Sequence, residues 1–194
     1  MKYLRYLLNY IISFFYDAYY FLFGTVRTRI QGLTYYAASK GYPDYLKHGN
    51  MSESVRPLAL YYCQGKGLDI GAGKWPLPGA RAIEDGKEEN AYHINEPDNA
   101  VDFVFSSHTL EHLYDWQTAL REWQRVLKPT GVLFLYLPHA ACGMWKPGVN
   151  IQHVWAPTAE TVRMFLREQL GMTIVEHSSV PDGYLSFYIV ARKV

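Results

Sequence analysis

The sequence contains little cysteine and carries almost no net charge. Cys63 and Cys142 are the only cysteines in 194 residues. Two thiols are too few for a disulfide framework or a four-cysteine metal site, and their scarcity fits a reducing cytoplasm. Charged residues make up 19% of the chain and the formal net charge is +1, so no overall field attracts nucleic acid. We therefore expect a cytoplasmic protein that has no nucleic acid among its partners.

The chain is long enough for one sizeable core and too short for two large domains. Aromatic residues make up 16% of the chain and crowd its N-terminal third. We expect an N-terminal segment over residues 1–50, made of an apolar helix and a connector rich in Gly, Pro and Tyr from Gln31 to Asn50. One catalytic domain over residues 51–194 is expected to follow it.

An amphipathic helix is predicted within residues 1–24. Leu, Ile, Phe and Tyr predominate there, and a polar residue recurs at every fourth position, at Arg5, Asn9, Ser13 and Asp17. This spacing gives the helix one narrow polar stripe. Asp17 exposed to lipid would cost about 3 kcal/mol, so we do not expect the helix to span a membrane. Two roles stay open: peripheral contact with the inner face of a membrane, or packing on the catalytic domain or on a second copy of the chain.

The most informative chemical signal is the run GLDIGAG at residues 67–73. It reads as a buried strand that contains a carboxylate, Asp69, and ends in a glycine turn. Gly71 and Gly73 flank Ala72, and glycine alone tolerates positive φ without steric cost and leaves no Cβ in the way of a ligand. The turn therefore indicates a small-molecule site, although glycine pairs also serve ordinary tight turns.

Two further motifs downstream give the turn a family context. Residues 101–113 read VDFVFSSHTLEHL, and residues 125–133 read RVLKPTGVL. Together with DIGAG they resemble the class I S-adenosylmethionine-dependent methyltransferases, in particular a small type-11-like branch, over roughly residues 66–194. The resemblance implies a Rossmann-like α/β three-layer sandwich with a mostly parallel seven-stranded sheet, in the order 3-2-1-4-5-7-6 with the seventh strand antiparallel. It implies S-adenosyl-L-methionine as cofactor and says almost nothing about the methyl acceptor.

The resemblance also implies which residues bind the cofactor. A carboxylate at the end of the second strand would accept hydrogen bonds from the ribose hydroxyls. Glu84 and Asp85 are both placed for this role, and we favour Glu84 because it directly follows the apolar strand. The expected cofactor-binding residues are Asp69, Gly71, Ala72, Gly73, Glu84, Asp85, Asn90, Ala91, Ser106 and His108, of which Asn90 and Ala91 stand where the family often has Asp-Ala beside the adenine amino group.

One departure from the family pattern follows the glycine turn. Pro76 and Pro78 do not permit the usual crossover helix. The chain therefore has to cross over through a loop. The same prolines, and the absence of a third glycine opening a helix, argue against a dinucleotide-binding site.

Histidines are the candidate catalytic residues. A hydroxyl acceptor needs a general base, and histidine has the pKa closest to neutral pH. His139 follows a predicted strand and His153 lies in a loop that would roof the cleft, so both are predicted to contact the acceptor or act as base. His112 beside Glu111 is predicted to be structural. No metal site is expected, because no two histidines stand at i, i+4 on a helix and neither cysteine has metal-like spacing.

The sequence thus favours a methyltransferase acting on a small-molecule, glycan or lipid-linked acceptor. One alternative is a catalytically inactive cofactor-binding scaffold anchored by the N-terminal helix. Another is an NAD(P)-dependent oxidoreductase, since an acidic ribose ligand serves both cofactors.

Overall fold

The computed structural model describes residues 26–30, 33–37, 55–73, 76–140, 145–148, 150, 152–178, 180–182 and 185–194. The helix predicted within residues 1–24 lies outside these ranges. In the described part of the chain, no helix is long and apolar enough to cross a membrane. Two short strands, β1 (Val26–Ile30) and β2 (Leu33–Ala37), pair antiparallel. Part of the segment expected to be a connector is therefore a hairpin.

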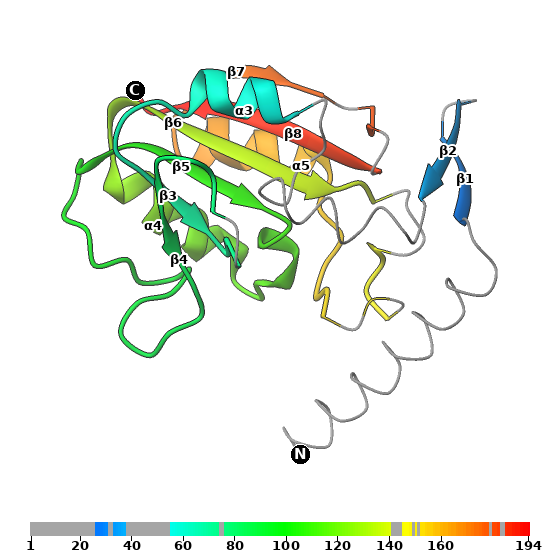
Figure 1. Cartoon of the computed structure of the whole chain (residues 1–194), viewed down its shortest axis with the longest axis horizontal. Coiled ribbons are helices and arrows are strands. Elements are labelled where there is room, and N and C mark those ends of the chain that lie inside the picture. The colour runs from blue at the N-terminus through cyan, green and yellow to red at the C-terminus, as the bar shows by residue number, and fades with distance from the viewer. Residues whose placement is uncertain are drawn as a thin grey trace.

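The main sheet has six strands in the order β4-β3-β5-β6-β8-β7 (Figure 1). Its parallel part is formed by β3, β4, β5 and β6, and β8 runs antiparallel to both β6 and β7. The strands are β3 (Gly67–Ile70), β4 (Ala80–Ile83), β5 (Val101–Ser107), β6 (Leu127–Pro138), β7 (Thr173–His177) and β8 (Ser186–Arg192). The mostly parallel Rossmann-like sheet with its antiparallel strand next to the edge is confirmed.

The expectation of seven strands is wrong for the described residues. Residues 84–100 connect β4 to β5, and the whole segment is described, yet it contains only an isolated bridge between Asn90 and His93. This stretch is rich in Glu, Asp and Asn; Asp and Asn favour turns, and the stretch offers no apolar alternation for a strand. The third strand of the family order is therefore missing, and β4 is an edge strand.

Helices cover both faces of the sheet, α3 on one side and α4 and α5 on the other (Figure 1). They are α3 (Arg56–Tyr62), α4 (Trp116–Val126) and α5 (Ala159–Met164), which continues as a π-helix, η3 (Phe165–Gln169). The Thr158 side chain caps α5 by accepting a hydrogen bond from the Thr161 N–H.

Alternating side chains of β6 divide the core into two layers. Phe134 and Tyr136 pack in the layer that contains α3, whereas Leu133 and Leu135 pack in the layer that contains α4 and α5. Both sets are fully buried, as expected for a central strand covered on both faces. Trp123 of α4 is also fully buried and belongs to the core. The rigid sheet between these layers positions the loops at the carboxyl ends of its strands.

Candidate functional site

The glycine turn after β3 has the backbone conformation that the sequence predicted. Gly71 has φ +75° and Gly73 has φ +61°, values that favour glycine. A Cβ at Gly71 would lie 2.1 Å from Thr109 Oγ1, whereas a Cβ at Gly73 would meet no atom of the described residues within 4 Å. The two glycines therefore differ in role: Gly71 lets the turn pack against the segment after β5, and Gly73 leaves open space on the side where a ligand could lie.

Asp69 supports the loop that replaces the crossover helix. Its carboxylate is 2% exposed and accepts a hydrogen bond of 2.7 Å from the Leu77 N–H. Burial raises the pKa of Asp69 to about 7, against the lowering effect of this hydrogen bond. Residues 76–79 form no helix, in agreement with the prediction drawn from the two prolines. Asp69 thus links this loop to β3 through its hydrogen bond with Leu77.

Glu84 lies directly after β4 and is joined to the glycine turn. Its Oε1 atom accepts a hydrogen bond of 2.7 Å from the Gly73 N–H. Glu84 is exposed, so its carboxylate is reachable by a ligand. Asp85 is also exposed, but the hydrogen bond to the turn is made by Glu84. The geometry therefore places Glu84 at the turn, as the sequence argument favoured.

Asn90 and Ala91 are engaged in their own loop. The Asn90 amide donates to the Gly86 carbonyl at 3.2 Å and accepts from the Tyr92 N–H at 2.9 Å. The Ala91 carbonyl accepts a hydrogen bond of 2.8 Å from Trp123 Nε1. These bonds hold residues 86–92 against α4, and Asn90 would have to exchange a local bond to reach an adenine.

The segment after β5 is bonded to the end of β3. Ser106 Oγ and Thr109 Oγ1 each donate to the Ile70 carbonyl at 3.0 Å. His108, between them, has φ +50°, a conformation that is costly for residues other than glycine and is often found at functional sites. Its Nε2 atom lies 2.9 Å from Ser186 Oγ. Ser106 and His108 therefore lie beside the glycine turn, as the sequence predicted.

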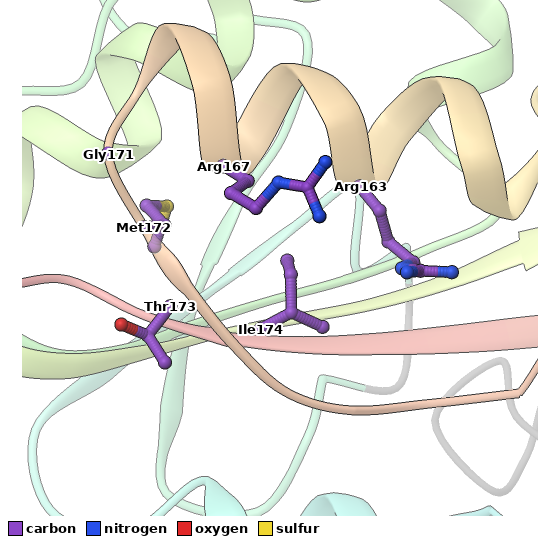
Figure 2. Close-up of a pocket in the computed structure, with 6 residues that line it drawn as sticks. All are labelled: Arg163, Arg167, Gly171, Met172, Thr173 and Ile174. Atoms are coloured by element: carbon purple, nitrogen blue, oxygen red, sulfur yellow. The ribbon is translucent and has the colours of Figure 1, made fainter.

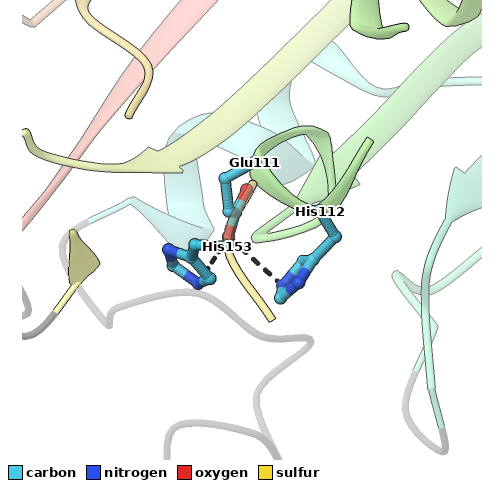
Figure 3. Close-up of side chains that lie close together, drawn as sticks. All are labelled: Glu111, His112 and His153. Carbon is cyan, nitrogen blue, oxygen red and sulfur yellow. Dashed lines mark ion pairs between the residues drawn. The ribbon is translucent and has the colours of Figure 1, made fainter. Parts of the chain in front are cut away.

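A carboxylate and two histidines converge next to this segment (Figure 3). Glu111 and His112 belong to a short 3₁₀ helix, η1 (Leu110–His112), and His153 comes from the loop before α5. Glu111 Oε1 lies 3.7 Å from His112 Nε2 and 3.7 Å from His153 Nε2. His108 Nδ1 lies 3.5 Å from the same oxygen. We call Glu111, His112 and His153 the EHH cluster.

The EHH cluster is buried and electrostatically unusual. Glu111 is fully buried, and among the described residues neither of its carboxylate oxygens has a hydrogen-bond partner. Burial raises its pKa to about 8. His112 Nδ1 lies 3.1 Å from the Gln152 carbonyl, and His153 Nδ1 lies 2.7 Å from the Trp145 carbonyl. Burial lowers the pKa of His112, and that of His153 to about 4, so both rings are neutral near pH 7.

His139, the other histidine predicted to be catalytic, is not a member of the EHH cluster. It directly follows β6, where its N–H donates to the Leu185 carbonyl at 2.8 Å and its ring meets the edge of Phe187. The sequence argument against a metal site considered spacing along one helix. It did not consider that the fold can bring Glu111 and His112, which follow β5, next to His153, which lies 41 positions after His112.

A hollow in the surface lies at the other edge of the sheet from the strands that carry the glycine turn. The hollow, of about 490 Å³, is bounded by η3 and the start of β7, with Arg163 and Arg167 on one side (Figure 2). Thr173, in its lining, pairs with Arg192, which pairs with Val132 of β6, and Val132 pairs in turn with Phe103 near the amino end of β5. The hollow is thus at the opposite edge from the carboxyl ends of the parallel strands, where ligands bind in open α/β sheets.

Comparison with known sequences agrees with this geometry. A family profile described as a methyltransferase domain matches residues 49–135. The uncharacterized protein YafE of Escherichia coli is 36% identical over 114 residues, which are 58% of this chain and 51% of YafE. The chain therefore spans about half the length of this curated relative.

Several solved structures with this fold are named as methyltransferases. A possible histamine N-methyltransferase of Thermotoga maritima superposes with a TM-score of 0.57 at 15% identity, covering 80% of this chain and 96% of that one. The 1,6-didemethyltoxoflavin-N1-methyltransferase of Burkholderia thailandensis, solved with bound S-adenosylhomocysteine, gives a TM-score of 0.54 at 16% identity, covering 80% and 84%. Such low identity shows a shared fold. Residues 49–135 thus match the profile of a methyltransferase domain, and the chain has the fold of S-adenosylmethionine-dependent methyltransferases.

Proposed function

We propose that this protein transfers the methyl group of S-adenosylmethionine to a small-molecule acceptor, which can be free or carried by a glycan or lipid. The observation that carries the proposal is the bond between Glu84 and the Gly73 N–H, which joins the acidic end of β4 to an open glycine turn. The didemethyltoxoflavin enzyme among its structural relatives acts, by its name, on a small molecule, which favours an acceptor of this class.

The residues at the turn fit the cofactor. Gly73 offers bare backbone, and Glu84 offers an exposed carboxylate that can accept hydrogen bonds from two ribose hydroxyls. When bound, the cofactor supplies an electrophilic methyl group, so the main task of the protein is to align the acceptor and exclude water. No dinucleotide-binding helix follows the turn, since residues 76–79 form a loop, which favours this cofactor over NAD(P).

The acceptor would lie at the carboxyl edge of β5 and β6. His139 directly follows β6, and His153 faces Glu111 beside the end of β5. Both remain our candidates for contact with the acceptor. Neutral imidazole can accept a hydrogen bond or a proton at its free nitrogen, so either residue could orient a hydroxyl or amine acceptor toward the methyl group.

A matched pair of glycine substitutions tests the cofactor site. Gly73 and Gly171 have almost equal φ values, +61° and +63°, and a Cβ at either would meet no atom of the described residues within 4 Å. Alanine at either position should cost about 1 kcal/mol of stability through backbone strain. Gly73→Ala should also fill space next to the ligand. We expect it to weaken S-adenosylhomocysteine binding at least about tenfold, whereas Gly171→Ala should leave binding unchanged.

Isothermal titration calorimetry of the whole chain would measure these affinities, with NADH as the comparison ligand. Binding of S-adenosylhomocysteine alone, lost in Gly73→Ala, supports the proposal and justifies a screen of acceptors by radiolabelled methyl transfer. Equal affinity of Gly73→Ala and Gly171→Ala for S-adenosylhomocysteine would show that the glycine turn is not part of the cofactor site. Gly71→Val is less suitable, because its side chain would collide with Thr109 and disturb the fold.

A further inference from the structure

We propose that the EHH cluster binds a divalent transition-metal ion, of the class of Zn²⁺, beside the cofactor site. The potential ligand atoms of Glu111, His112 and His153 all lie within 4.8 Å of one another (Figure 3). Two ligand atoms that are each about 2.1 Å from a tetrahedral zinc ion lie about 3.4 Å apart. The distances of 3.7 Å from Glu111 Oε1 to both Nε2 atoms are wider by a few tenths of an ångström, and the whole cluster lies within 4.8 Å. The side chains would therefore have to move inward by up to about 1 Å to close around an ion.

The hydrogen bonds of the two rings leave their other nitrogens ready to bind metal. A carbonyl oxygen only accepts, so His112 Nδ1 must donate to Gln152 and His153 Nδ1 must donate to Trp145. In a neutral ring the remaining nitrogen, Nε2, then carries a lone pair. Both Nε2 atoms face the Glu111 carboxylate. Backbone carbonyls that fix the ring tautomer in this way are the usual outer partners of metal-binding histidines.

The buried carboxyl group of Glu111 is suited to a cation. Glu111 is fully buried and receives no hydrogen bond from the described residues, and an isolated buried carboxylate is costly. Such a group is kept either as the neutral acid or by a cation beside it. A metal ion held between the three groups would take the place of the proton and would bind the carboxylate together with the Nε2 lone pairs of His112 and His153.

The ligand types select the class of metal. Two imidazoles and one carboxylate suit zinc and its neighbours in the first transition row, whereas Mg²⁺ and Ca²⁺ prefer oxygen ligands. Three protein ligands also leave a coordination position open, as in catalytic zinc sites. Thr109, two residues before Glu111, meets the glycine turn at Gly71. The ion would therefore lie close to the cofactor.

A metal at this position would bind the acceptor, a role that rests on the proposed function. A hydroxyl oxygen in the open position would lose its proton to solvent more easily than in water. That oxygen would form the new bond to the methyl carbon, while the carbon–sulfur bond breaks and its electron pair stays on sulfur. His153 would then act through the ion, in place of the role of general base predicted from sequence.

Metal titration of the chelator-treated chain tests the site without any activity assay. Co²⁺ added to the protein should give visible absorption bands of a four- or five-coordinate site with one ion per chain, and Zn²⁺ should displace them. Mg²⁺ should not compete. Glu111→Gln and His112→Ala should each weaken Co²⁺ binding by about 100-fold or more. His93→Ala, which removes an exposed histidine outside the cluster, should bind as the natural chain does.

The outcomes separate this proposal from the methyltransferase proposal. If the folded chain binds S-adenosylhomocysteine but not Co²⁺ or Zn²⁺, the metal site is wrong and the proposed function stands. Equal Co²⁺ affinity in Glu111→Gln and the natural chain, with circular dichroism showing both folded, would place the ion elsewhere and also overturn the site. Stoichiometric Co²⁺ binding that is lost in both cluster variants supports it, even if S-adenosylhomocysteine does not bind.

Discussion

At the scale of single residues, the site depends on buried acids that have unusual surroundings. Asp69 and Glu111 are both almost inaccessible to solvent, and burial raises the pKa of each. They differ in their partners, because Asp69 accepts a hydrogen bond from Leu77 whereas Glu111 receives none from the described residues. Asp69 therefore has a role within the apo fold. Glu111 gains a comparable role only when a cation fills the EHH cluster.

Asp69→Asn should stabilise the protein in a way that depends on pH. The folded-state pKa of Asp69 is about 7, raised from 3.8. As pH rises from 4 to 7 the unfolded chain loses this proton before the folded protein does, so the folded state becomes relatively less stable, by at most about 4 kcal/mol. Asparagine carries no titratable carboxyl group, so the variant does not lose stability in this way as the pH rises. Urea unfolding at pH 4.5 and pH 8 should show its advantage over the natural chain growing toward pH 8.

A difference between the two chains that is the same at both pH values would show that Asp69 does not titrate as described. Asparagine keeps an oxygen that can accept from the Leu77 N–H. The comparison therefore changes the charge and preserves the hydrogen bond. The other titrating groups are common to both chains and cancel in the difference, provided that they act independently.

At the scale of elements, side-chain caps mark where α4 and α5 begin. Thr158 caps α5 by accepting from the Thr161 N–H at 3.1 Å, and Asp115 caps α4 by accepting from the Thr118 N–H at 3.1 Å. Each satisfies one of the backbone donors that the first turn of a helix leaves unpaired. The α5 cap also fixes the end of the loop that carries His153.

Thr158→Ala should lower the free energy of unfolding by about 1 kcal/mol, because the Thr161 N–H loses its acceptor. Thr158→Ser keeps the hydroxyl and should stay within a few tenths of a kcal/mol of the natural chain. Chemical denaturation of the three proteins measures both changes. Equal loss in the serine and alanine variants would assign the effect to the methyl group of Thr158 and not to its hydrogen bond.

Elements with strong apolar patterns could be predicted closely. The run before the glycine turn, which reads as a buried strand, coincides with β3, and the motif that begins at Val101 contains β5. Both strands are mostly apolar and lie in the middle of the sheet. The missing third strand could not be foreseen from the family order, because residues 84–100 are governed by polar turn contacts. The EHH cluster was missed because it depends on how the loop before α5 folds back over η1.

At the scale of the whole molecule, the N-terminal segment is the main untested feature. Its predicted polar stripe and apolar face suit either a lipid headgroup layer or a protein surface. The full chain should co-sediment with vesicles that contain anionic lipid if the helix lies on membranes, and a chain lacking residues 1–24 should stay in the supernatant. Co-sedimentation of neither form, together with a dimer in analytical ultracentrifugation that the deletion dissociates, would assign the segment to protein packing.

The missing third strand has a consequence for how copies of this protein meet. A free strand edge offers unpaired N–H and carbonyl groups to a neighbouring chain and invites aggregation. Arg81 projects from β4 and forms ion pairs with Glu89 and Glu96, which fold back from the loop that follows, and Lys66 also pairs with Glu96. Charges of this kind disfavour strand-to-strand stacking. The loop that replaced the strand therefore protects the protein's colloidal solubility, and high salt, which screens these pairs, is the condition in which that protection weakens.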